Sequence, residues 1–117
     1  MIMTKKKKYR QIITYKNYFN DFYRKQNLKV KKKIIWTLQI IEQIDRIPKT
    51  YLEHLEGTDG LYEIRIKFSS NIYRIFCFFN KGKLVILTNG FQKKSQKTPK
   101  KEIEKALRIK KEYENEK

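Results

Sequence analysis

Three short runs of residues between Leu61 and Asn89 limit the possible folds of this chain more than any other feature. Each run is rich in β-branched and aromatic residues and has the length of a strand; they are Leu61 to Phe68, Ile72 to Phe79 and Lys83 to Asn89. The connections Ser69-Ser70-Asn71 and Asn80-Lys81-Gly82 are too short for a parallel crossover, which needs roughly a dozen residues or more. The sequence therefore predicts three antiparallel strands joined by tight hairpins.

A strand and two helices are expected before these runs. Tyr9 to Tyr15 has the composition of a strand. Apolar residues then recur with a helical period from Asn17 to about Gln26 and again from Lys29 to Asp45. The longer helix carries an apolar stripe made of Val30, Ile34, Leu38, Ile41 and Ile44. A stripe of this kind predicts a helix packed on the sheet.

A third helix is expected after the strands, over residues 99–117, with Thr98 as its N-cap and Pro99 as its first residue. The order is then β-α-α-β-β-β-α within one domain of 117 residues. We expect an α+β fold with an antiparallel four-stranded sheet and the two N-terminal helices packed on one face. The other face stays partly open, and a functional site is expected there.

The net charge indicates the kind of partner. Lys and Arg number 29 against 12 Asp and Glu, a formal charge of +17, and such self-repulsion in a small domain points to an anionic partner. Residues 1–8 form a basic N-terminal arm, either a nucleic-acid contact or a solvated terminus. Cys77 cannot form an internal disulfide and is expected to pack in the core. Without a secretory signal or the roughly 18 apolar residues that span a bilayer, we expect a cytoplasmic protein with no membrane contact.

One face of the predicted hairpins is charged. Glu63, Arg65 and Lys67 alternate with apolar residues, and a two-residue loop at Ser69-Ser70 would place Arg65 opposite Arg74. Like charges directly opposite each other destabilise a sheet, so this pair needs an anion. Glu63 can supply part of the negative charge, and an RNA phosphate the rest. The alternative is a solvated face whose arginines pair with carboxylates.

A lysine-bearing segment follows the last strand. Lys93, Lys94 and Lys97 leave the sheet after a glycine and can reach back over the charged face. Phe91 or Phe76 could stack on an unpaired base, as recognition of single-stranded RNA requires, although Phe91 is at least as well suited to anchor the core. Glu63, Lys67, Phe91 and Lys97 are therefore candidate RNA-binding residues.

The residue types also limit the chemistry. The chain has no pair of histidines, no acidic cluster with metal-ligand spacing and no phosphate-binding glycine motif. Cleavage of RNA through the 2′-hydroxyl needs a base, charge stabilisation at phosphorus and a proton donor. We expect catalysis without metal or cofactor, in which Arg65, Arg74 and a lysine stabilise charge while Glu63 or a lysine transfers protons.

Several segments resemble a known family. They are GLYEIRIKF, NIYRIFCFF, the tail GFQKKSQKTPKKEIEKA and the helical pair before them. They resemble the RelE/ParE superfamily of toxins from type II toxin–antitoxin systems, in its HigB-like, phage-derived branch. The resemblance covers nearly the whole chain and is strongest from Gly60 to Ala106. It implies a microbial RNase-like fold, cleavage of mRNA on the ribosome, and neutralisation by an antitoxin that often carries a helix-turn-helix domain. We expect this antitoxin to present an acidic surface.

The resemblance also places the catalytic residues. The family's basic positions fall on Arg65, Arg74 and Lys93 or Lys94, with Lys67 and Lys97 as secondary candidates. Some relatives carry a histidine or tyrosine for proton transfer near the end of the last strand or in the C-terminal segment, where this chain has Asn89 and Pro99. The general acid and base are therefore unassigned. We expect a ribosome-dependent mRNA endonuclease that inhibits translation; the alternatives are a ParE-like gyrase inhibitor and a non-catalytic module that binds nucleic acid or antitoxin.

Overall fold

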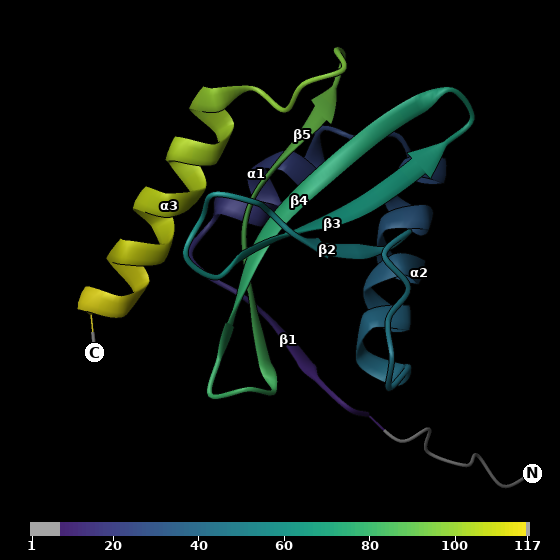
Figure 1. Cartoon of the computed structure of the whole chain (residues 1–117). Helices are drawn as coiled ribbons and strands as arrows, with labels where there is room; N and C mark the ends of the chain where they lie inside the picture. Colours follow the sequence, from purple (N-terminus) through teal and green to yellow (C-terminus); the bar gives the residue numbers. More distant parts are fainter. Residues whose placement is uncertain (1–7, 117) are drawn as a thin grey trace, which may run out of the picture.

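The computed structural model describes residues 8–116, so most of the predicted N-terminal arm (residues 1–8) lies outside the described residues. Over residues 8–116 the chain forms five strands and three helices (Figure 1). In chain order they are β1 (Gln11–Thr14), α1 (Tyr18–Arg24), α2 (Leu28–Gln43), β2 (Leu52–His54), β3 (Leu61–Phe68), β4 (Asn71–Asn80), β5 (Leu84–Lys93) and α3 (Lys100–Asn115). This is the α+β class that the sequence predicts. No helix within the described residues is both long and apolar enough to cross a membrane.

The strands form one sheet in the order β1-β5-β4-β3-β2. β3, β4 and β5 are the predicted antiparallel hairpins, and β3 and β4 have the predicted register. Phe68 lies opposite Asn71 and Arg65 lies opposite Arg74. Ser69 takes a positive φ of 57° in the turn. The tight loop therefore places the two arginines on the same face of the sheet.

The sheet differs from the prediction at both edges, because it is mixed and five-stranded rather than antiparallel and four-stranded. β1 pairs with β5 in parallel, with Ile13 opposite Ile86. No hairpin connects these two strands, so local sequence does not determine their relative direction. β2 forms between α2 and β3, where the predicted order β-α-α-β-β-β-α has no strand, and it ends at His54. Its three residues are too few to show a strand pattern.

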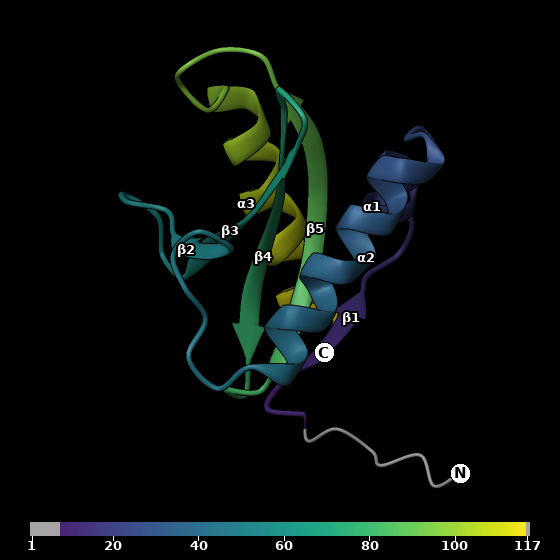
Figure 2. The same cartoon turned by 90° about the vertical axis from the view of Figure 1, so that its right-hand side faces the viewer.

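The helices α1 and α2 cover one face of the sheet (Figure 2). The Asn27 side chain caps α2 by accepting a 2.9 Å hydrogen bond from the backbone N–H of Val30. Four members of the predicted stripe are buried on this face: Val30, Ile34, Leu38 and Ile41. Ile44 lies beyond the helix end and is 36% exposed. Cys77 is fully buried in the same core, as predicted.

α3 packs on the opposite face, so that face is only partly open (Figures 1 and 2). A second buried cluster forms beneath α3 from Leu61, Phe76, Phe91 and Ala106. Pro99 occupies the N-cap position and α3 begins at Lys100, which corrects the predicted start at Pro99. This difference is within the usual variation of helix ends. The part of this face that α3 leaves uncovered is available for a functional site.

Candidate functional site

Residues facing α3 change from apolar to charged along the sheet. The pair nearest the covered end is Leu61 and Phe78, followed by Glu63 and Phe76. The next row crosses three strands and contains Arg65, Arg74 and Phe91, and the last contains Lys67, Ile72 and Lys93. Since residues two apart along a strand share a face, the alternation in the sequence produces this gradient directly.

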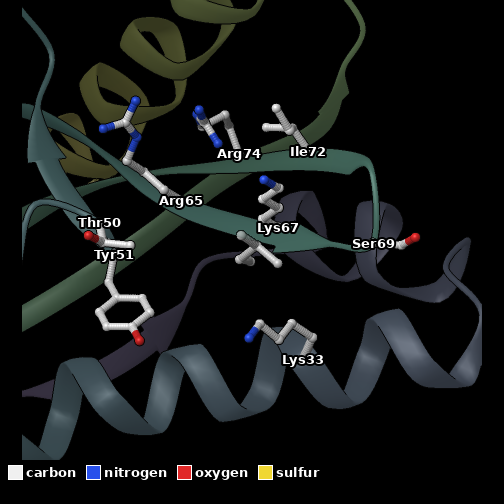
Figure 3. A pocket seen from close by; sticks show the side chains of 9 residues that line it. Lys33, Thr50, Tyr51, Arg65, Lys67, Ser69, Ile72 and Arg74 are labelled. Atoms are coloured by element: carbon white, nitrogen blue, oxygen red, sulfur yellow. The ribbon is translucent and has the colours of Figure 1, made fainter.

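The charged rows open onto a groove of about 670 Å³ (Figure 3). Its lining consists of Lys33, Thr50, Tyr51, Arg65, Ile66, Lys67, Ser69, Ile72 and Arg74. Figure 3 shows Arg65 and Arg74 rising side by side from neighbouring strands, with Lys33 and the Tyr51 ring on the α2 side of the groove. The groove therefore runs from the open face around the β3 edge of the sheet.

A carboxylate links the two arginines, as the sequence predicted. Oε2 of Glu63 is 3.4 Å from Nε of Arg65, and Oε1 of Glu63 is 3.7 Å from Nε of Arg74. Arg65 also pairs through Nη1 with Glu53 Oε1 at 3.0 Å. Glu53 belongs to β2, and the sequence did not identify it because the segment gave no strand signal. The carboxylate pairing that the sequence offered as an alternative to phosphate binding is thus present at Arg65.

Arg74 is less completely paired than Arg65. Its side chain is buried, and Nη1 donates a 3.1 Å hydrogen bond to the carbonyl oxygen of Tyr73. Within residues 8–116, Arg74 Nε and Glu63 Oε1 are buried atoms that lack a hydrogen-bond partner. Burial lowers the pKa of Arg74; the Glu63 carboxylate opposes this shift and the Arg65 guanidinium reinforces it. A second anion at this position would therefore stabilise the cation.

The predicted lysines lie next to this groove. Lys93 and Lys94 line a second hollow of about 430 Å³ together with Ser70, Ile72, Ser95 and Gln96. Ile72 lines both hollows, so they meet at the open end of the sheet. Lys97 is exposed in the loop before α3 and is not among the residues that line either of these two hollows. The fold thus brings Arg65, Arg74, Lys67, Lys93 and Lys94 to one end of the sheet.

The predicted stacking residues do not face the groove. Phe76 is fully buried, which rules it out as a platform for a base. Phe91 is 8% exposed, and its ring centroid lies 5.4 Å from that of Phe76, under α3. Phe91 is therefore a core anchor, the alternative that the sequence offered, and its assignment to RNA binding is corrected. The helix periodicity alone could not show that α3 covers this part of the face.

No group of three or more His, Cys, Asp or Glu side chains within the described range is arranged to hold a metal ion. The single histidine, His54, packs against Tyr62 with a centroid distance of 5.2 Å. The groove is lined by guanidinium, ammonium, hydroxyl and phenol groups, and the carboxylates of Glu63 and Glu53 contact its arginines.

A comparison with protein families matches the chain to the model described as "Phage derived protein Gp49-like (DUF891)" over residues 21–111. The matched range runs from α1 into α3 and includes every residue that lines the groove. No curated protein matches the chain significantly.

Proposed function

We propose a function from one premise: this chain belongs to the phage-derived Gp49-like family, which comprises toxin-like proteins of toxin–antitoxin systems. The protein is the toxin component of a type II toxin–antitoxin system, in the HigB-like branch of the RelE/ParE superfamily. It acts as a ribosome-dependent mRNA endonuclease that inhibits translation without a metal or cofactor. Its cognate antitoxin is of the helix-turn-helix type and carries an acidic surface.

The observation that carries this proposal is the pair of opposed guanidinium groups, with Glu63 between them and a groove above them. A guanidinium binds two oxygens of a phosphate through parallel hydrogen bonds. Attack of a ribose 2′-hydroxyl on the adjacent phosphorus adds negative charge to the phosphate oxygens. Arg65 and Arg74 stabilise that charge, and the low exposure of Arg74 strengthens the interaction because little water screens it.

The remaining residues orient the pair and transfer protons. Glu63 lies within ion-pair distance of both arginines, so we assign it to holding their guanidinium groups in position. Lys67, Lys93 and Lys94 lie at the open end of the sheet. We assign the two proton transfers to these lysines: one accepts the proton of the attacking 2′-hydroxyl, and another donates a proton to the leaving 5′-oxygen.

Inducible expression in a bacterial host tests the function. Wild-type protein should arrest growth and generate new mRNA 5′ ends that disappear when ribosomes are kept off the message. Arg65→Ala and Arg74→Ala should abolish both effects, while Arg108→Ala, which removes an exposed cation from α3, should abolish neither. A folded Arg65→Ala/Arg74→Ala protein that remains fully toxic would contradict the assignment. Growth arrest with intact mRNA and accumulating DNA damage would instead indicate a gyrase inhibitor.

The partner proposal follows from charge and has its own test. A chain with a formal charge of +17 attracts an acidic antitoxin over long distances, and salt screens that attraction. The association rate with the purified antitoxin should therefore fall steeply as salt is raised, with a smaller effect on dissociation. An association rate that is indifferent to ionic strength would refute this electrostatic account.

A further inference from the structure

The groove has a second wall that neither the proposed chemistry nor the core uses. Lys33 of α2 and Thr50 and Tyr51 of the α2–β2 connection form this wall. Figure 3 shows the Tyr51 ring extending toward α2, on the opposite side of the β3 edge from Arg65 and Arg74. A strand of RNA held at the arginines would have this wall beside it.

The wall is accessible because β2 is short. β2 pairs only with Tyr62, Glu63 and Ile64 of β3. One further backbone hydrogen bond, from the Arg65 N–H to the Tyr51 carbonyl oxygen at 2.8 Å, fixes Tyr51 next to the arginine. Residues 66–68 of β3 have no pairing partner on that side within the described chain. The edge of the sheet next to α2 is therefore unpaired beyond Arg65, and the backbone of Tyr51 is fixed beside this unpaired edge.

An exposed tryptophan fixes the ring of Tyr51. Trp36 is 42% exposed and lies outside the buried stripe of α2. Its ring meets the Tyr51 ring nearly edge-to-face, with a centroid distance of 5.7 Å and an interplanar angle of 73°. Lys33, one turn earlier, places Nζ 4.5 Å from the centroid of the Trp36 ring. Lys33, Trp36 and Tyr51 together form a group of one cation and two rings, which we call the aromatic cluster.

We propose that Tyr51 stacks on an unpaired base of the RNA whose phosphate is held by Arg65 and Arg74. Trp36 positions the Tyr51 ring, and the Lys33 ammonium group contacts the phosphate backbone of the RNA next to that base. Stacking of this kind accepts any base, because every base has a π-face. Four cationic residues line the groove, Lys33, Arg65, Lys67 and Arg74, and their charge selects a nucleic-acid strand over an apolar peptide as the occupant. This assignment rests on the proposed function, and it replaces Phe76 and Phe91 as the predicted stacking residues.

The chain contains a direct reporter of this site, because Trp36 is its only tryptophan. We would titrate the purified protein with a short single-stranded RNA that carries 2′-O-methyl groups and so cannot be cleaved through its 2′-hydroxyl. Stacking at Tyr51 should change the Trp36 fluorescence, and the same oligonucleotide with an abasic residue at each position in turn should abolish the change at one position. No variant is needed for this readout, so it does not depend on the folding of a mutant.

Variants measure the contribution of stacking. Tyr51→Ala should weaken RNA binding by roughly 5- to 150-fold, the usual range for loss of one base stack, while Tyr51→Phe should change it by less than about twofold. Ile35→Ala, at a 40% exposed apolar residue of α2 that does not line the groove, is the matched control and should leave binding unchanged. If the aromatic cluster only supports the fold, Tyr51→Ala will lower the melting temperature without altering the affinity of the folded protein for RNA.

The outcomes separate this inference from the proposed function. RNA binding that depends on Arg74 but leaves the Trp36 fluorescence unchanged would overturn the stacking site and leave the proposed function intact. A wild-type protein that does not bind this RNA but still cleaves mRNA on ribosomes would overturn the stacking site alone. One that neither binds the RNA nor cleaves mRNA on ribosomes would overturn both. A fluorescence change together with a weakened Tyr51→Ala variant would support the stacking site.

Discussion

Glu63 is a buried carboxylate that lies within ion-pair distance of two arginines. Its removal should therefore reduce the stability of the fold as well as disturb the candidate site. Glu63→Gln should lower the free energy of unfolding by about 1–3 kcal/mol, because it leaves two directly opposed guanidinium groups with less negative charge. Urea unfolding measures this change. Glu104→Gln, at an exposed position of α3, is the control and should alter stability by less than about 0.5 kcal/mol. An unaltered urea midpoint for Glu63→Gln would show that the arginines do not depend on this carboxylate.

Gly90 is required by close packing rather than by an unusual backbone angle. A Cβ atom at this position would lie 2.5 Å from Cδ2 and 2.7 Å from Cγ of Phe22, which is itself buried. Gly90→Ala should therefore lower the free energy of unfolding by about 1–3 kcal/mol through overpacking. Thermal unfolding measures this loss. In a Phe22→Leu background the same substitution should cost less, and an equal cost in both backgrounds would contradict this contact as the cause.

The candidate site residues that could be predicted from the sequence lie on, or directly after, strands that tight hairpins join. The period of two residues along β3 and the two-residue loop after Phe68 determine that Glu63, Arg65 and Arg74 share a face. Lys33 and Tyr51 reach the groove, and Glu53 reaches Arg65, only through the packing of α2 and the pairing of β2. These are long-range arrangements, and no local pattern encodes them.

The helix α3 is held to the rest of the molecule by a cluster of polar contacts near its C-terminal end. Lys16 pairs with Glu112, and with Glu116 at 2.9 Å. The hydroxyl of Tyr15 donates a 2.6 Å hydrogen bond to Glu116, and that of Tyr18 donates a 2.7 Å hydrogen bond to Glu112. The cluster ties the β1–α1 turn to α3, the helix that covers Phe76 and Phe91.

This cluster should make the attachment of α3 depend on pH. Hydrogen bonds from Lys16 and Tyr18 lower the pKa of Glu112, and hydrogen bonds from Tyr15 and Lys16 lower that of Glu116. Depressed carboxylate pKa values stabilise the fold above the unfolded value of about 4.3, and this contribution is lost as the pH falls through the lower folded values. At the alkaline side, burial and the bond to Glu116 raise the pKa of Tyr15 to about 12. Its contribution is complete below about pH 10 and is lost as the pH rises through 12.

NMR chemical shifts of the α3 amides, followed against pH, measure this attachment. We expect them to move toward random-coil values below about pH 4 before the β-sheet signals change. Lys16→Met should weaken the pH dependence of the α3 signals, because it removes a partner of both carboxylates. α3 signals that stay constant down to the pH at which the sheet itself unfolds would contradict the role of this cluster.

At the scale of elements, the central hairpins and the helices followed from local patterns, whereas the edges of the sheet did not. Periodicity located α1 and α2, the capping residues Thr98 and Pro99 located α3, and short loops required β3, β4 and β5 to be antiparallel. The parallel pairing of β1 with β5 depends on the path of the chain through α1, α2 and the strands that separate β1 from β5 in the sequence. The face covered by α3 depends on which apolar surface remains after α1 and α2 have packed. Both are decided by tertiary contacts, which explains the incorrect expectation for Phe91.

The whole molecule is a strongly basic domain whose sheet separates two buried clusters, and the candidate site lies where the smaller cluster ends. The formal charge of +17 indicated a polyanionic partner from the sequence alone. The fold supplies the location, because the row of Arg65 and Arg74 and the row of Lys67 bring cations to a groove. The reaction follows neither from charge nor from fold class and needs a direct chemical test.

The central claim is that this groove cleaves RNA through the 2′-hydroxyl, with Arg65 and Arg74 stabilising the charge on the phosphate. Purified protein should be mixed with ribosomes that hold an mRNA in the decoding site, and the ends of the products should be identified. The account predicts a 2′,3′-cyclic or 3′-phosphate end, no cleavage when the scissile nucleotide is 2′-deoxy, and a rate at least about 100-fold lower for Arg74→Ala. Cleavage of the 2′-deoxy message at the normal rate, or an Arg74→Ala protein as active as the wild type, would contradict it.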